Sequence, residues 1–257
     1  MIRRLIAVFI LGLVVIGLVF YALGPKAGRM VVSVPVAVAH TGHGGMADLY
    51  FTLENPGGPD ALVSASLPSG GTATIQRPAG IGVTPIPEGA SPAFSADGVF
   101  LRLTGLAASL DPGTLIPVEL HFENSGPVTF KARVGDDGSD HMAHMADAES
   151  ADSPGPAPTL SMSAKARGES GPWDITLTTG NFAFVRVEDG TPDRSGEGHA
   201  HLYLNGLKLG RVYSDTASIG ALLPGTYRVT VALNTNTHRP YMADGKPVTA
   251  QATITSE

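Results

Sequence analysis

The residues of this chain with the most metal-binding potential are histidines and methionines that stand close together. His199 and His201 flank a single alanine, and His238 lies in the later polar segment 234–238. Imidazole nitrogens bind Cu(II) and Zn(II), so three histidines on neighbouring elements predict a metal site. The alternative is that these histidines are exposed and complete hydrogen bonds at the end of a sheet.

A second group lies in residues 136–158, which are rich in Gly, Asp, Ser, Ala and Pro and show no apolar period. Such a composition is typical of a flexible linker. His141, Met142, His144 and Met145 stand inside it, where an apolar core cannot account for the methionines. Imidazole and thioether groups are soft ligands that suit copper. We predict that this cluster captures copper, with an incidental polar linker as the alternative.

A third group occupies the glycine-containing segment 40–46. His43 and Met46 could converge there, because glycines let the backbone fold tightly. A mobile polar loop is the alternative. In a further variant, cleavage after Ala39 would free the amine of His40, which could then chelate Cu(II) together with its imidazole.

Composition restricts the function classes. The chain has 17 lysines and arginines against 23 aspartates and glutamates, a net charge of −6, which argues against nucleic acid as a partner. It contains no cysteine, so disulfides, thiolate metal sites and a cysteine nucleophile are excluded. The sequence has no Gly-x-Ser-x-Gly, phosphate-loop or His-Glu-x-x-His motif. We therefore expect no enzyme activity, with catalytic zinc on the three histidines as the remaining enzyme alternative.

The amino terminus predicts export. An uncharged apolar run extends from Leu5 to Leu23 and is nearly long enough for the roughly 30 Å hydrocarbon core of a bilayer. Gly24-Pro25-Lys26 follows instead of a small-x-small cleavage site, so residues 1–30 favour an uncleaved transmembrane anchor over a signal segment. The soluble part is expected in the periplasm, tethered to the cytoplasmic (inner) membrane. It would be periplasmic or secreted if the segment is cleaved.

The rest of the chain has the period of two and the frequent turns of an all-β protein. We expect two β-sandwich domains, residues 31–135 and 159–257, joined by the linker. The Asn205-Gly206 pair predicts a hairpin turn. In a strand, His199 and His201 share one face and Ala200 points to the other. The expected strands are 32–38, 49–53, 99–103, 116–122 and 128–134 in the first domain, and 173–178, 182–187, 199–204, 207–213 and 227–233 in the second.

Three segments, Ala47–Asn55, Asp60–Ser66 and Leu115–Glu123, resemble the PCu(A)C family of periplasmic copper chaperones. The resemblance covers most of the first domain. It implies a cupredoxin-like β-sandwich that delivers Cu(I) toward the copper centre of cytochrome oxidase. No family is assigned to the second domain.

The PCu(A)C resemblance also implies a site built from a His, a later Met and a His-x-Met. This chain departs from that pattern, with Thr74-Ile75-Gln76-Arg77 at the first His and Phe100-Leu101-Arg102 at the His-x-Met. A guanidinium cannot bind a metal ion. The site at Gln76 and Arg102 is therefore predicted to be vacant.

Taken together, the sequence predicts a membrane-tethered periplasmic copper chaperone. In this hypothesis, the cluster at 141–145 captures Cu(I) or Cu(II), and the three histidines of the second domain hold or relay it. The recipient would be an exported copper enzyme such as a cytochrome oxidase subunit. The alternative is a membrane-anchored double β-sandwich with a structural or protein-interaction role and no metal. The sequence does not determine the oligomeric state.

Overall fold

The computed structural model describes residues 29–40, 43–79, 81–107, 109–135, 156–188 and 191–257. Within these ranges every regular element is a β-strand, which confirms the all-β prediction. The strands of the first unit are β1 Val31–Ala39, β2 Ala47–Glu54, β3 Asp60–Ser66, β4 Thr72–Gln76, β5 Thr84–Ile86, β6 Ala93–Phe94, β7 Phe100–Thr104, β8 Leu115–Phe122 and β9 Gly126–Val134. Those of the second unit are β10 Thr159–Ala166, β11 Trp173–Gly180, β12 Ala183–Phe184, β13 Glu197–Leu204, β14 Leu207–Val212, β15 Thr216–Ile219, β16 Gly225–Asn234, β17 Met242–Ala243, β18 Lys246–Pro247 and β19 Thr249–Ser256.

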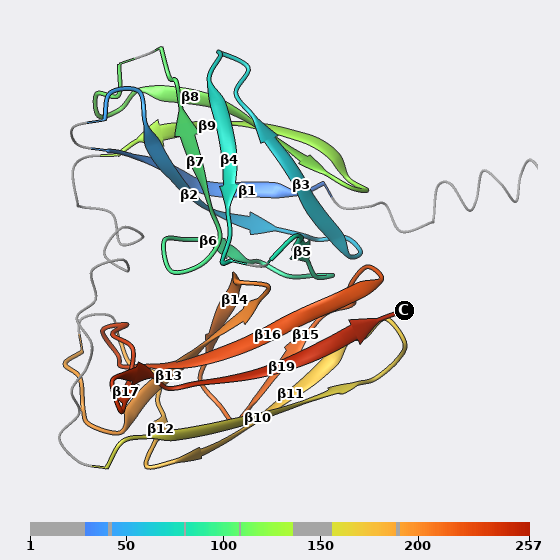
Figure 1. The fold of residues 1–257 in the computed structure, drawn as a ribbon, viewed down its shortest axis with the longest axis vertical. Helices are drawn as coiled ribbons and strands as arrows, with labels where there is room; N and C mark the ends of the chain where they lie inside the picture. The colour runs from blue at the N-terminus through green and yellow to red at the C-terminus, as the bar shows by residue number, and fades with distance from the viewer. Residues whose placement is uncertain (1–28, 41–42, 80, 108, 136–155, 189–190) are drawn as a thin grey trace, which may run out of the picture.

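One hydrogen-bonded sheet runs through both units (Figure 1). Its order is β19-β16-β13-β14-β6-β2-β1-β9-β8-β3-β5, and the two units meet where β14 pairs with β6. In the first unit β7 pairs with both β2 and β4. In the second unit β10, β11 and β15 form a separate three-stranded sheet, and β12 pairs with β13. Strand β13 therefore lies in the interior of the large sheet, between β14 and β16.

Each unit has its own cluster of buried apolar side chains. The first includes Phe51 and Phe94, whose rings stack at 4.2 Å between centroids, and it also takes in Leu207 from β14. The second gathers around Trp173 and Tyr241 and fills the space between the two sheets. Burial of apolar surface is the main stabilising term in such cores. Because Leu207 packs in the first core, the two units share apolar contact as well as strand pairing.

Several predicted elements differ from the observed ones. The alternation predicted for 32–38 is interrupted by a bulge in β1, where Val34 has φ 48° and is 70% exposed. The strand predicted over 182–187 shortens to β12, because the chain beyond it leaves the sheet after Val185 N donates to the Gly198 carbonyl at 2.8 Å. Strands β3, β10 and β19 were not predicted from the sequence. In β10 the signal was present, because Leu160, Met162 and Ala164 alternate with polar residues and pack against the second core.

Two predicted segments fall largely outside the described residues. Residues 1–28 of the anchor predicted over 1–30 lie outside the described residues. So do His141, Met142, His144 and Met145, which fall in residues 136–155. Among the residues that the structure describes, no helix has the length and apolar character needed to cross a bilayer.

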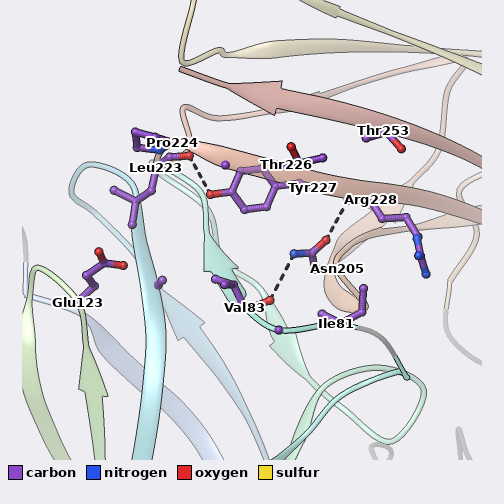
Figure 2. Close-up of a pocket in the computed structure, with 13 residues that line it drawn as sticks. Ile81, Val83, Glu123, Asn205, Leu223, Pro224, Thr226, Tyr227, Arg228 and Thr253 are labelled. Atoms are coloured by element: carbon purple, nitrogen blue, oxygen red, sulfur yellow. Dashed lines mark hydrogen bonds between the residues drawn. The ribbon is translucent and has the colours of Figure 1, made fainter.

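The β13–β14 hairpin forms a large part of the contact between the units. Asn205 and Gly206 both have positive φ, 48° and 79°, as a tight hairpin turn requires, which confirms the predicted turn. In the pocket between the units (Figure 2), Asn205 Nδ2 donates to the Val83 carbonyl at 3.3 Å. Asn205 Oδ1 accepts from Arg228 N at 2.8 Å. The turn is thereby held by both units.

The loop between β6 and β7 presses against this hairpin. A Cβ added to Gly98 would lie 2.6 Å from the Gly206 carbonyl oxygen, so only glycine fits there without a shift of backbone. Lys208 of β14 pairs with Ala93 of β6 on the same side of the interface. The loop that contains Asp97 is therefore held at a fixed position against the second unit.

We predict that Gly98→Ala lowers the free energy of unfolding by about 1–3 kcal/mol, because the methyl group overpacks a backbone contact. Gly58→Ala is the matched control, since a Cβ there meets nothing within 4 Å. Denaturant unfolding followed by circular dichroism measures both. Equal stability of the two variants would contradict the close packing of the loop on the hairpin.

Candidate metal centre

Three histidines converge on one face of the large sheet in the second unit. His199 and His201 lie on β13, where they pair with Asn234 and Ala232 of β16. His238 lies in the loop that follows β16, with φ 69°, a left-handed conformation that is uncommon outside glycine. Asn234 Nδ2 donates to the His238 carbonyl at 2.9 Å and so braces this loop. The sequence prediction that these three residues meet agrees with the geometry, while metal binding by them stays a prediction.

The nitrogens form a small triangle. His199 Nε2 lies 3.0 Å from His201 Nε2 and 3.1 Å from His238 Nδ1, and His238 Nδ1 lies 3.4 Å from His201 Nε2. Three nitrogens bound tetrahedrally at roughly 2.0–2.1 Å from a metal ion stand about 3.3 Å apart. The triangle thus has the dimensions of a three-histidine metal site with only small adjustment of the rings.

Burial excludes one alternative interpretation of β13. His199 is 3% exposed and His201 is 1% exposed, so the idea of exposed histidines at a sheet end is wrong for both. Ala200 on the opposite face is also fully buried, within the second core. The strand is therefore covered on both faces. Ala200→Ser would place a hydroxyl in this core, which makes Ala200 a poor site for a control substitution.

Burial also sets the charge of the imidazoles. The pKa of His199 is lowered from 6.5 to about 2, first by burial and then by the neighbouring His201 and His238. Burial likewise lowers the pKa of His201. Both rings are therefore neutral near pH 7 and can offer lone pairs, as metal ligation requires.

The position of one proton follows from the partners of Tyr203. Its hydroxyl donates to Asp97 Oδ2 at 2.8 Å, so its oxygen can only accept the hydrogen bond shared with His201 Nδ1 at 3.2 Å. His201 Nδ1 must then carry the proton. Its Nε2 is left unprotonated and faces the other two histidines.

Asp97 belongs to the first unit and stands at the centre of this network. Its Oδ2 lies 3.6 Å from His201 Nδ1 and accepts from Lys208 Nζ at 2.9 Å, and its Oδ1 accepts from Ser95 Oγ at 2.6 Å. Burial raises the pKa of this carboxyl, but His201, Lys208 and Ser95 together hold the pKa well below its usual range. Asp97 is therefore an anion behind the ring of a candidate ligand, the arrangement that orients histidines in metal sites.

The remaining nitrogens of the triangle need one proton when no metal is bound. Because His201 Nε2 is an acceptor, a single proton on His199 Nε2 or His238 Nδ1 completes a hydrogen bond within the triangle. A second inward proton would face the first at about hydrogen-bond distance and repel it. A metal ion would replace that proton and satisfy all three lone pairs at once.

The loop 235–239 that carries His238 is fixed from outside by Asp193. This carboxylate accepts from Thr237 N at 2.9 Å, Thr237 Oγ1 at 2.7 Å and Arg239 Nη2 at 2.7 Å. Beside His199 lies a small cavity lined by Arg211, Tyr213 and Asn236 among others. The buried amide atoms of Asn236 have no hydrogen-bond partner within the described residues.

The other predicted ligands are arranged differently. His43 is exposed and Met46 is half-buried in the turn after β1, where His40 N donates to the Met46 carbonyl at 3.0 Å. The His40 imidazole lies 2.9 Å from Asp48 Oδ2, and the rings of His40 and His43 are 6.5 Å apart. Within the described part of the chain, no third histidine or carboxylate joins this pair in a metal-sized cluster.

At the position of the chaperone family's ligands the structure has an ion pair. Strands β4 and β7 place Thr74 opposite Arg102 and Gln76 opposite Phe100. The Arg102 guanidinium donates to both oxygens of Asp48 at 2.8 Å. A cation held in this way repels a metal ion, in line with the predicted vacancy of that site.

Sequence reasoning missed the residues behind the histidines. Tyr203 could have been found from the sequence, because it continues the spacing of two that places His199 and His201 on one face of the strand. No sequence pattern indicated Lys208 or Asp97, because only the docking of the first unit brings Asp97 beside β13.

A protein-family model and several solved domains match the first unit. A protein-family model described as "LpqE-like: Putative lipoprotein LpqE-like" matches residues 29–134. Among solved structures, the copper-bound PCuAC domain from PmoF2 is 21% identical, with coverage of 43% of this chain and 95% of that chain and a TM-score of 0.38. The apo PCuAC domain from PmoF1 is 24% identical, with coverage of 42% and 95% and a TM-score of 0.38. No curated protein matches the chain.

The buried histidines predict a pH dependence of the metal-free protein. Unfolded His199 takes up a proton near pH 6.5, whereas in the fold its pKa is about 2. The unfolded state therefore binds more protons between these values, and stability is lost as the pH falls below about 6.5, by up to about 1.4 kcal/mol per pH unit. His199→Gln should flatten this slope. Denaturant titrations at several pH values with a chelator present measure the slopes, and equal slopes in the parent protein and the variant would contradict the assignment.

Proposed function

We propose that this chain is an exported copper-binding protein in which His199, His201 and His238 hold one copper ion for transfer. The observation that carries the proposal is the triangle of imidazole nitrogens at 3.0–3.4 Å on a buried strand face. His199 and His201 are buried and neutral, and His238 is half-buried beside them. Imidazoles that converge in this way have few other uses, since their lone pairs repel one another unless a proton or a metal ion lies between them.

Donor type supports copper. For a set of three nitrogens, divalent first-row metals follow an affinity order that peaks at Cu(II), with Zn(II) below it. The chain has no cysteine, which suits contact with copper in an oxidising compartment. The lipoprotein named in the family description and the apolar run at residues 5–23 both favour export. The resemblance of the first unit to copper chaperones is consistent with the same cargo.

In the proposed cycle the chain's own groups bind and release the ion. Copper would displace the single proton shared within the triangle, and His201 would keep its Nδ1 proton on Tyr203. The loop carrying His238 supplies the ligand that does not come from β13 and could open to release the ion. The cluster His141, Met142, His144 and Met145 would capture copper first, and a membrane-bound copper enzyme such as a cytochrome oxidase subunit would receive it.

The competing function is a structural or protein-interaction double sandwich. In that case the three histidines would only share protons with one another, and the second unit would serve as a scaffold. Direct metal binding distinguishes the two functions.

We predict that the purified chain binds at least one Cu(II) with micromolar or tighter affinity, and that His199→Ala and His201→Ala each weaken this affinity at least about tenfold, or roughly 1.4 kcal/mol. Each change removes one of three ligands held by the strand ladder. His238→Ala should act similarly. His121→Ala is the matched control, because its half-buried imidazole pairs with Glu119 and lies in the first unit.

Isothermal titration in competition with a chelator measures the affinities, and circular dichroism shows whether each variant is folded. Unchanged affinity in folded His199→Ala and His201→Ala would remove the site from the second unit. The absence of copper retention by the parent chain would leave the structural alternative.

We further predict that Arg102→Ala and Gln76→Ala leave copper affinity unchanged. Arg102 is engaged with Asp48, and neither residue lies among the three histidines. The same titration tests this, and loss of binding in either variant would place copper at the position that the chaperone family uses.

A further inference from the structure

Resting on the proposed copper site, we infer that Asp97 is a positioning residue supplied by the first unit, so that the histidine site of the second unit is complete only when the two units are docked. Asp97 lies behind His201, on the side of the ring away from the triangle. It therefore acts through His201 and not as a ligand itself.

Two hydrogen bonds link Asp97 to His201 through Tyr203. Asp97 Oδ2 accepts the Tyr203 hydroxyl proton at 2.8 Å, and this leaves the tyrosine oxygen to accept from His201 Nδ1 at 3.2 Å. The order of donors is set by the carboxylate, since it can only accept. Without it the hydroxyl is free to turn and donate to His201 Nδ1. His201 would then carry its proton on Nε2, where it would block the metal.

Asp97 reaches its position beside Tyr203 and His201 only because the two units are docked. It lies in the loop between β6 and β7, which is closed by the hydrogen bond from Ser95 N to the Val99 carbonyl at 2.9 Å. Gly98 meets the Gly206 carbonyl closely, and Lys208 of β14 donates to Asp97 Oδ2 at 2.9 Å. Strand pairing between Ala93 and Lys208 sets the loop beside β13.

The position of Asp97 affects how tightly the three histidines bind a metal ion. Loss of an outer carboxylate that orients a ligating histidine typically weakens metal binding by about 10- to 100-fold. Because coupling between two equilibria is reciprocal, an ion bound by the histidines would also favour the docked arrangement of the units. The first unit would then control how tightly the second holds its cargo, although its own family-type ligand position contains the Arg102–Asp48 ion pair.

The test uses the whole chain without metal. Two-dimensional ¹⁵N NMR of the histidine side chains reports which ring nitrogen carries the proton, a readout that a purely structural role of Asp97 would not change. We expect His201 in the parent protein to be protonated on Nδ1. In Asp97→Ala it should shift to the Nε2-protonated or mixed form. Asp111→Ala, which removes an exposed carboxylate from the same unit, should leave His201 unchanged.

The same variants are then titrated with Cu(II) in competition with a chelator. Asp97→Ala should bind about 10- to 100-fold more weakly than the parent. Asp97→Asn should recover part of the loss, because its amide oxygen can still accept from Tyr203. If Asp97→Ala does not fold, Asp97→Ser, whose shorter polar side chain no longer reaches the Tyr203 hydroxyl, is used for both measurements.

An unchanged His201 proton position together with unchanged affinity in folded Asp97→Ala or Asp97→Ser would overturn the inference. If the parent chain binds no Cu(II), the proposed function fails, while the NMR result on the metal-free protein still decides the role of Asp97.

Discussion

Strand β13 is buried on both faces, and this constraint shapes the arrangement around it. One face completes the second apolar core through Ala200, Leu202 and Leu204. The other must bury His199 and His201, whose polar atoms then need partners that water cannot supply. The two histidines find partners in each other, in His238 and in Tyr203. A site with neutral, fixed imidazoles follows from that requirement.

The histidine face of β13 also depends on the docking of the two units. The hairpin of β13 and β14 joins the sheet of the first unit through β6, and Leu207 enters the first core. Lys208 is buried at this junction, and its charge is met by Asp97. Buried ion pairs cost desolvation energy, so one that is retained beside a histidine cluster points to a role in geometry. Asp97 therefore belongs both to the interface between the units and to the surroundings of the candidate metal centre.

The two units therefore contribute differently. The first unit carries the match to the LpqE-like family model and contains the ion pair of Arg102 with Asp48. The second unit carries the convergent histidines.

Much of the fold was accessible from the sequence, because it depends on local pattern. Alternation of apolar residues predicted most strands around the cores, and Asn205-Gly206 predicted the hairpin, since few other residues adopt positive φ in such a turn. The bulge at Val34 and the short β12 were missed. Both depend on where neighbouring strands begin and end, which no local pattern records.

For the candidate site, the sequence alone determined that His199 and His201 share one strand face, because side chains in a strand alternate. It also indicated His238 as a third partner on a nearby loop. Only the tertiary structure decided that His199 and His201 are buried, that the nitrogens of the three imidazoles lie 3.0–3.4 Å apart, and that Asp97 stands behind His201. The physical reason is distance along the chain. The burial of His199 and His201 and the contact between Asp97 and His201 arise from the packing of segments that are far apart in the sequence. The periodicity of a single strand contains no information about its neighbours.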